Sequence, residues 1–255
     1  MPSLRRRAGT SLLGLASLAA ALLVWDRFAS GAGRGDVASL DAVGRLLVDR
    51  HELLVAAAAV TLGEAALGLL TGTVFAVVAA WAAHVTAGAR GPLQHLMLIC
   101  YAVPLVALGP LLTASVDRGA IPVIAAAISA ALPVFSSAEA GFGAVREGLR
   151  DLLTVHGAGR WRRLVLLEVP GALPYAIDGI KFAVPGALLG ALIGEWFGVE
   201  RGLGVLLVSG LREGQSDLVT AVSVLVVVTS SAVYALFARW ARTVQRRRGI
   251  TGSVT

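Results

Sequence analysis

Hydrophobic residues fall into six long blocks along the chain, separated by polar or basic segments. The blocks cover residues 11–28, 53–83, 93–116, 120–142, 175–197 and 218–238. A helix of about 20 apolar residues is long enough to cross the hydrocarbon core of a membrane. Because every block reaches this length range, the pattern predicts an all-α, polytopic membrane protein with about six transmembrane helices.

The first block leaves two interpretations open. Arg5, Arg6 and Arg7 precede it, and the small residues Ala29 and Ser30 follow it, as they would around the cleavage site of a signal peptide. The other interpretation is a first helix that is retained. Residues 29–52 are polar and of mixed charge, which indicates a segment outside the membrane.

We expect one transmembrane domain over 1–255. It would consist of a first helix and external segment (1–52), a membrane core (53–238) and a basic tail (239–255).

One long basic segment, residues 146–174, lies between the fourth and fifth blocks. Within it Leu149, Leu152, Leu153 and His156 have the spacing of one helix face. Gly157 then interrupts the pattern, as a residue that can adopt the left-handed conformation at a helix end. The segment therefore predicts an elbow of two short helices with an apolar face that another protein could bind. The alternative is a solvated basic loop that only sets the membrane topology.

The second half of this segment predicts another short helix. Trp161, Leu164 and Val165 are expected on one side of it. Pro170 and Pro174 are expected to end it, because proline lacks a backbone N–H and disfavours helix in the residue before it.

The basic segment resembles the cytoplasmic coupling loop of bacterial ATP-binding-cassette (ABC) importer permeases. That family has Glu-Ala-Ala, three residues, Gly, nine residues and then Ile-x-Leu-Pro. Here Asp151, Leu152 and Leu153 stand for the triplet, and Gly157 and Pro170 match in spacing and identity. The two leucines are bulkier than the alanines of the family.

A second motif resembles one branch of these permeases, the nitrate/sulfonate/taurine type. It consists of Glu195, Gly198, Arg201, Gly202, Leu203 and Gly204. Members of this branch carry nitrate, alkanesulfonates, taurine and some vitamin precursors.

The resemblance implies a transmembrane permease subunit of an ABC importer in a bacterial cell membrane. It implies three protein partners: ABC ATPase subunits, a second permease (an identical copy or a similar chain) and an external substrate-binding protein. ATP and Mg²⁺ would bind the ATPase, so no cofactor is expected in this chain. The coupling residues would be Leu149, Asp151, Leu152, Leu153, Gly157 and Pro170. The resemblance also favours a retained first helix.

Composition supports a membrane protein over other classes. Hydrophobic residues make up 56% of the chain and charged residues only 15%, which is too apolar for a soluble domain. The net charge of +6 comes from arginines at the ends of apolar blocks, so we expect a lipid membrane and no nucleic acid as partner. The sequence contains no nucleotide-binding, hydrolase or metalloprotease motif, and the single Cys100 has no ligand partner at metal-site spacing. We therefore expect no catalytic residues, no metal site and no enzyme.

Basic residues set the expected orientation. Fourteen lie on the side of the two termini and the 146–174 loop, and seven lie on the other side. The positive-inside rule therefore predicts that both termini and the loop are cytoplasmic.

The blocks themselves contain candidates for a pathway or a subunit interface. Glycines recur every four residues in the fifth block, and such small-residue stripes let helices approach closely. Packing against a helix of the same chain is the alternative. The candidates are Glu64, Gly186, Gly190, Gly194, Glu195, Gly202 and Gly204.

Acidic residues at membrane depth are costly and so suggest a role. Glu64 could pair with an arginine or stand in the pathway, and Glu195 could contact substrate or accept hydrogen bonds from the glycine-rich segment after it. Glu139 is expected in a contact near the cytoplasmic face, and Asp178 and Lys181 in a local ion pair. The alternative function that these acids leave open is a proton-coupled secondary transporter.

Overall fold

The computed structural model describes Val24, Arg27 and residues 38–86, 88–145 and 147–247. Its regular elements are all helical over these residues, as predicted. The helices are α2 (Leu40–Asp49), α3 (His51–Val85), α4 (Arg90–Ala102), α5 (Leu105–Ser115), α6 (Ile121–Gly143), α7 (Glu147–Val155), α8 (Arg160–Arg163), α9 (Val169–Glu195), α10 (Leu203–Arg212) and α11 (Ser216–Arg247), with a 3₁₀ turn at Arg118–Ala120 and a π-helical turn at Leu164–Glu168.

Four helices are long and apolar enough to cross a membrane, and a bent pair adds a fifth span if it is counted as one. The first predicted span, the question of its cleavage and the last residues of the basic tail lie outside the described residues. The third predicted span is not one straight helix, because α4 and α5 meet at 96°. Pro104 precedes α5 in an extended conformation, where its ring and missing N–H end α4.

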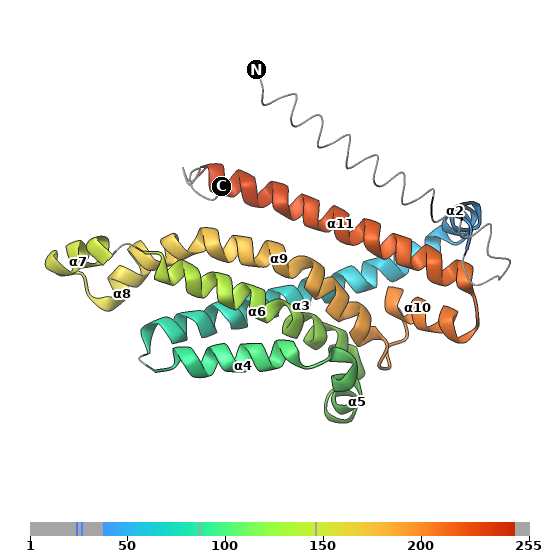
Figure 1. Cartoon of the computed structure of the whole chain (residues 1–255), viewed down its shortest axis with the longest axis horizontal. Helices are drawn as coiled ribbons and strands as arrows, with labels where there is room; N and C mark the ends of the chain where they lie inside the picture. The colour runs from blue at the N-terminus through green and yellow to red at the C-terminus, as the bar shows by residue number, and fades with distance from the viewer. Residues whose placement is uncertain (1–23, 25–26, 28–37, 87, 146, 248–255) are drawn as a thin grey trace, which may run out of the picture.

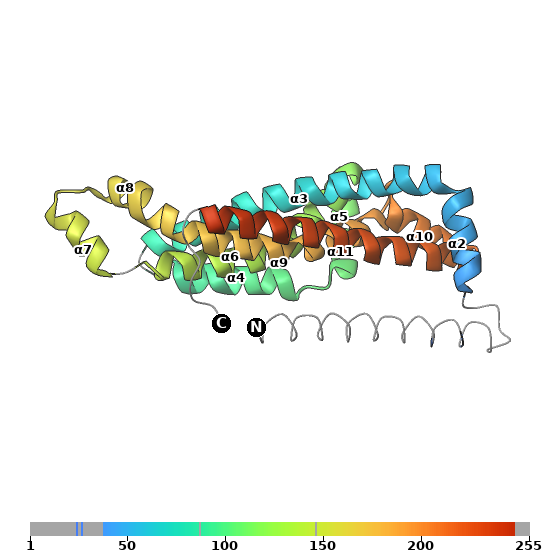
Figure 2. The same ribbon diagram turned by 90° about the horizontal axis from the view of Figure 1, so that it is seen from above.

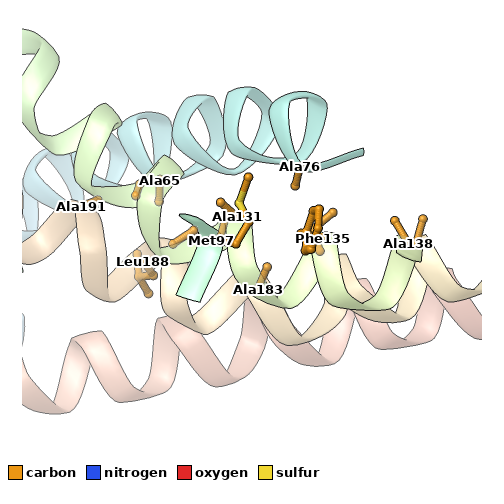
Figure 3. Packing of buried hydrophobic residues seen from close by; sticks show 14 of the residues in the cluster. Ala65, Ala76, Met97, Ala131, Phe135, Ala138, Ala183, Leu188 and Ala191 are labelled. Atoms are coloured by element: carbon orange, nitrogen blue, oxygen red, sulfur yellow. The ribbon is translucent and has the colours of Figure 1, made fainter. Parts of the chain in front are cut away.

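The core is formed by α3, α6 and α9, which run side by side along the long axis of the molecule (Figure 1). Small residues line their contacts, so the helix axes can come close. Figure 3 shows Ala65 and Ala76 on α3 facing Ala131 and Phe135 on α6, with Ala183 and Ala191 on α9 beside them.

The fifth span starts earlier than the sequence predicts. Helix continues from Arg160 to Glu195, and the prediction that Pro170 and Pro174 end the second loop helix is wrong. Pro170 lies in the first turn of α9, where a backbone N–H is not needed. The π-helical turn just before it changes the local hydrogen-bonding register, and Pro174 and Pro185 are accommodated inside α9.

The two ends of this bundle differ. At one end α7 and α8 project past the long helices, and at the other end lie α2 and α10 (Figures 1 and 2). We call these the loop end and the α10 end.

Candidate functional site

The loop end carries the predicted elbow, which we define as α7, the turn at Gly157 and α8. Gly157 has φ +76°, so the prediction of a left-handed residue at this helix end is confirmed. The amide of Gly157 donates to Thr154 O (3.0 Å) and that of Ala158 to Leu153 O (2.9 Å). These two bonds form a Schellman motif, which ends α7 and reverses the chain toward α8.

The apolar face of α7 is open. Leu149 is 43% exposed, Leu152 53% and Val155 85%, whereas Leu153 is half-buried. Asp151 is also exposed. Val155 was not predicted to belong to this face, although it lies three residues after Leu152 and could have been found from that spacing.

The second loop helix does not present the predicted face. Leu164 is only 8% exposed, whereas Trp161 is 72% and Val165 47% exposed. The prediction that these three side chains share one side is therefore wrong. The reason is the π-helical turn that begins at Leu164, because its wider turn shifts the side chains out of α-helical phase.

Arginines fasten the elbow to the ends of the long helices. Arg150 on α7 donates to Phe142 O on α6 (2.8 Å) and pairs with Glu168 on the π-helical turn (3.5 Å). Its guanidinium also lies 3.4 Å from His84 Nε2 on α3. Arg150 therefore links α7 to α3, to α6 and to the π-helical turn that leads into α9. Sequence reasoning missed His84 and Glu168, since their partners are 66 and 18 residues away from them in the chain.

Two further arginines of the loop end make similar contacts. Arg160 donates to Val85 O at the end of α3 (3.0 Å), and Arg163 donates to the Thr154 hydroxyl on α7 (2.8 Å). The elbow is therefore a projection held in place by its own hydrogen bonds.

At the α10 end, Glu195 organises a buried polar cluster. Its side chain is 2% exposed, and it accepts hydrogen bonds from the Thr61 hydroxyl on α3 (2.5 Å) and the Gly204 amide on α10 (2.5 Å). The Leu203 amide in turn donates to Thr61 Oγ1 (2.9 Å). We call Thr61, Glu195, Leu203 and Gly204 the Glu195 cluster. It supplies acceptors for two amides in the first turn of α10, which a helix otherwise leaves unpaired.

Glycines make this contact geometrically feasible. Gly202 has φ +136°, and a Cβ on it would collide with the Glu195 carboxyl group. A Cβ on Gly204 would collide with Leu192 O. The motif of glutamate and glycines therefore has a structural role: it joins the C-terminus of α9 to the N-terminus of α10. This is the hydrogen-bond role that the sequence left open for Glu195.

Glu64 lies one helical turn from Thr61 on α3, and its carboxyl group faces that of Glu195. Its Oε2 is buried and has no hydrogen-bond partner among the described residues. The structure thus brings Glu64 and Glu195 together, a pairing that the sequence did not predict.

The glycine stripe of α9 packs against α6 of the same chain. A Cβ on Gly190 would lie 2.6 Å from Ala125 O, and one on Gly194 would lie 2.5 Å from Pro122 Cα. On Gly186 the nearest atom, Ser129 O, would be 3.4 Å away. These contacts are the alternative that the sequence left open, and a role for the stripe at a subunit interface stays a prediction.

Two further predictions concern charged residues. Glu139 on α6 makes a contact, as predicted: it accepts from Arg90 Nε (2.5 Å) and Gln94 Nε2 (2.8 Å) on α4. That this contact lies near the cytoplasmic face stays a prediction. The predicted ion pair of Lys181 and Asp178 on α9 is confirmed, with a distance of 2.9 Å.

Comparison with known proteins decides the family. The model of the family described as "binding-protein-dependent transport system inner membrane component" matches residues 72–250. The chain belongs to this family. The match includes the elbow, the Glu195–Gly204 motif and the helices between them, so both regions lie inside the family's permease domain. The nitrate/sulfonate/taurine branch is a finer assignment that this match does not support.

Relatives and solved structures agree with the family. A probable ABC transporter permease protein of Haemophilus influenzae is 30% identical over 197 residues, covering 77% of this chain and 80% of the relative. The riboflavin transport system permease protein RibX of Chloroflexus aurantiacus is 31% identical over 107 residues, 42% of this chain and 40% of that one. The inward-facing methionine ABC transporter MetNI shares the fold, with a TM-score of 0.66 and 19% identity over 77% of this chain and 98% of that chain.

Proposed function

We propose that this chain is the membrane-spanning permease subunit of a bacterial ABC importer and that its elbow couples it to a separate ATPase. The observation that carries the proposal is the apolar face of α7, on which Leu149, Leu152 and Val155 are exposed. The helix that carries this face, α7, lies beyond the ends of the long helices (Figure 2). An amphipathic helix with an exposed apolar face is suited to a groove on a partner protein.

The arginine contacts supply the mechanism. When ATP binding moves the ATPase, α7 moves with it, and Arg150 transmits the displacement to α6 and to the start of the fifth span at Glu168. The Schellman turn at Gly157 fixes the angle between α7 and α8. The elbow then acts as a lever on α9, and the pathway between two permease subunits opens to the other side of the membrane.

The remaining partners follow from the same proposal. Two permease chains, identical or similar, form the pathway, an external binding protein delivers a small solute, and ATP and Mg²⁺ bind the ATPase. Both termini and the elbow lie in the cytoplasm, as the distribution of basic residues predicts.

The solute is proposed only as a class. RibX is named for riboflavin, and the predicted spans of this chain contain almost no basic residue besides Lys181 to hold an anion. Both observations favour a vitamin-like solute over nitrate, sulfonates or taurine. The glutamate–glycine motif remains the support for the nitrate/sulfonate/taurine branch, which also includes carriers of vitamin precursors.

The test is purification of the tagged chain from its native membrane in mild detergent, with identification of the proteins that accompany it. Wild type and Leu152→Met, which keeps the apolar surface, should retain an ATPase. Leu152→Glu should lose it about tenfold or more, because burial of a leucine side chain contributes about 1.5–3 kcal/mol. Recovery of the chain without an ATPase, together with solute uptake that stops when the proton gradient is dissipated, would instead establish the proton-coupled transporter.

A further inference from the structure

A cavity of about 570 Å³ lies at the base of the elbow. The end of α3 forms one wall, with Trp81 and His84, and α7, α8 and the π-helical turn form the others. The cavity is separate from the exposed face of α7, since Leu149, Leu152 and Val155 do not line it. The docking face of α7 therefore does not account for the cavity.

The lining is strongly basic. Arg150, Arg160 and Arg163 contribute three positive charges, against the single carboxylate of Glu168. That carboxylate is already engaged by Arg150 at 3.5 Å and by His84 at 3.5 Å. The field inside the cavity consequently favours an anion.

Several hydrogen-bond donors of the lining side chains also lack an acceptor. Among the described residues, Trp81 Nε1, Arg150 Nε and Arg163 Nε are buried without a hydrogen-bond partner. Arg150 Nε has only the ion pair to Glu168 Oε1, which is not a hydrogen bond. An unpaired buried donor is unfavourable, and three around one cavity indicate a ligand that brings several acceptor oxygens.

The position of the cavity further limits the kinds of ligand that it could bind. It lies where α3, a helix long enough to span a membrane, comes to its end. Trp81 and Trp161 line it, and tryptophan is enriched at the boundary between membrane and water. Arginine recognises phosphate oxygens through paired N–H donors, and basic pockets between helix ends bind lipid head groups.

We propose that this cavity binds a phosphate-type oxyanion, either the head group of an anionic lipid or a free phosphate. The bound oxyanion accepts hydrogen bonds from Arg160 and Arg163 and cross-links α8 to the end of α3. It thereby sets the resting position of the elbow. The proposal concerns the purified permease itself, so its failure would leave the ATPase coupling untouched.

The lipid source is tested in nanodiscs of phosphatidylcholine that contain a small fraction of phosphatidylglycerol. Native mass spectrometry then counts the phosphatidylglycerol retained by the wild type and by Arg160→Gln and Arg163→Gln. Each variant should retain about fivefold less, from the typical contribution of one arginine to binding an anionic lipid. Arg162→Gln is the matched control, because Arg162 is exposed on the same helix and does not line the cavity.

The soluble source is tested by equilibrium dialysis of the chain in phosphatidylcholine nanodiscs against radiolabelled inorganic phosphate. Binding that Arg160→Gln and Arg163→Gln weaken, and that Arg162→Gln does not, supports a free phosphate. Trp81→Phe is a further variant, which removes the unpaired indole N–H and keeps a smaller aromatic ring, and it should weaken binding of the same ligand.

Thermal unfolding in phosphate-free detergent shows whether each variant is folded, so that lost binding is not confused with lost structure. The proposal is overturned if folded wild-type protein retains neither ligand, or if the three arginine variants retain them equally. It is also overturned if Arg160→Gln and Arg163→Gln only reduce recovery of the ATPase, which would make the cavity part of the protein interface.

Discussion

At one end of α9, Glu195 is 2% exposed and accepts hydrogen bonds from Thr61 and Gly204, both within 2.5 Å. At the other end, the elbow leaves Leu152 53% and Val155 85% exposed, and three arginines line an open cavity. The Glu195 cluster thus satisfies its polar groups within the chain, whereas the loop end keeps apolar and basic groups available. The difference indicates that the α10 end stabilises the fold and that the loop end is available for binding partners.

Among the variants that are expected to fold, the largest effect on stability is expected from Glu195→Ala. This substitution leaves the Thr61 hydroxyl and the Gly204 amide buried without their acceptor, at a cost of about 3 kcal/mol in the free energy of unfolding. The unfolding midpoint in detergent measures it, and Glu200→Ala, an exposed carboxylate on the same side, is the control. Equal midpoints for the two variants would show that the Glu195 cluster does not hold the α10 end.

A smaller loss is expected from Gly204→Ala. The new Cβ would collide with Leu192 O and press against Glu195, and such overpacking costs about 1–3 kcal/mol. Gly63→Ala is the matched control, because a Cβ on Gly63 in α3 meets no atom within 4 Å. Alanine favours helix over glycine, so the control should gain stability while Gly204→Ala loses it in the same unfolding assay. A gain of stability in both variants would show that a Cβ at position 204 causes no steric clash.

The smallest effect on stability is expected at the loop end. Leu152→Glu should change the unfolding free energy of the isolated chain by less than about 0.5 kcal/mol, because the side chain is already exposed. The same substitution at Leu203, which is 1% exposed at the α10 end, should prevent stable folding. If Leu152→Glu were as damaging as Leu203→Glu, the exposed face of α7 would be part of the fold and not a docking surface.

Sequence reasoning succeeded where the signal is local. The left-handed Gly157, the apolar face around Leu152 and the Asp178–Lys181 pair all depend on residues within one or two helical turns. It failed at Pro170 and Pro174, because a proline rule for isolated helices does not include the π-helical turn that precedes them.

The long-range contacts that distinguish the two ends could not be predicted from the sequence. Thr61 is one hydroxyl in a long apolar run, 134 residues from Glu195, and nothing near it in the sequence marks its partner. His84 and Arg150 are likewise 66 residues apart and meet only because α3 and α6 pack along their length. Hydropathy identifies the membrane-spanning blocks, but it does not show which faces of the helices pack against one another.

We propose that the Gly157 turn transmits motion from the ATPase to the pathway. The direct test is ATP-driven solute uptake by the assembled transporter in proteoliposomes. Gly157 has φ +76°, which proline cannot adopt, whereas Gly159 has φ −64°, the value proline prefers. Neither position has an atom within 4 Å of an added Cβ, so the two substitutions differ in backbone conformation and in the loss of the hydrogen bond from the Gly157 amide to Thr154 O. Gly157→Pro is expected to insert normally but to lose ATP-driven uptake, while Gly159→Pro should retain most of it. Uptake at the wild-type rate by Gly157→Pro would show that the Gly157 turn is not needed for coupling.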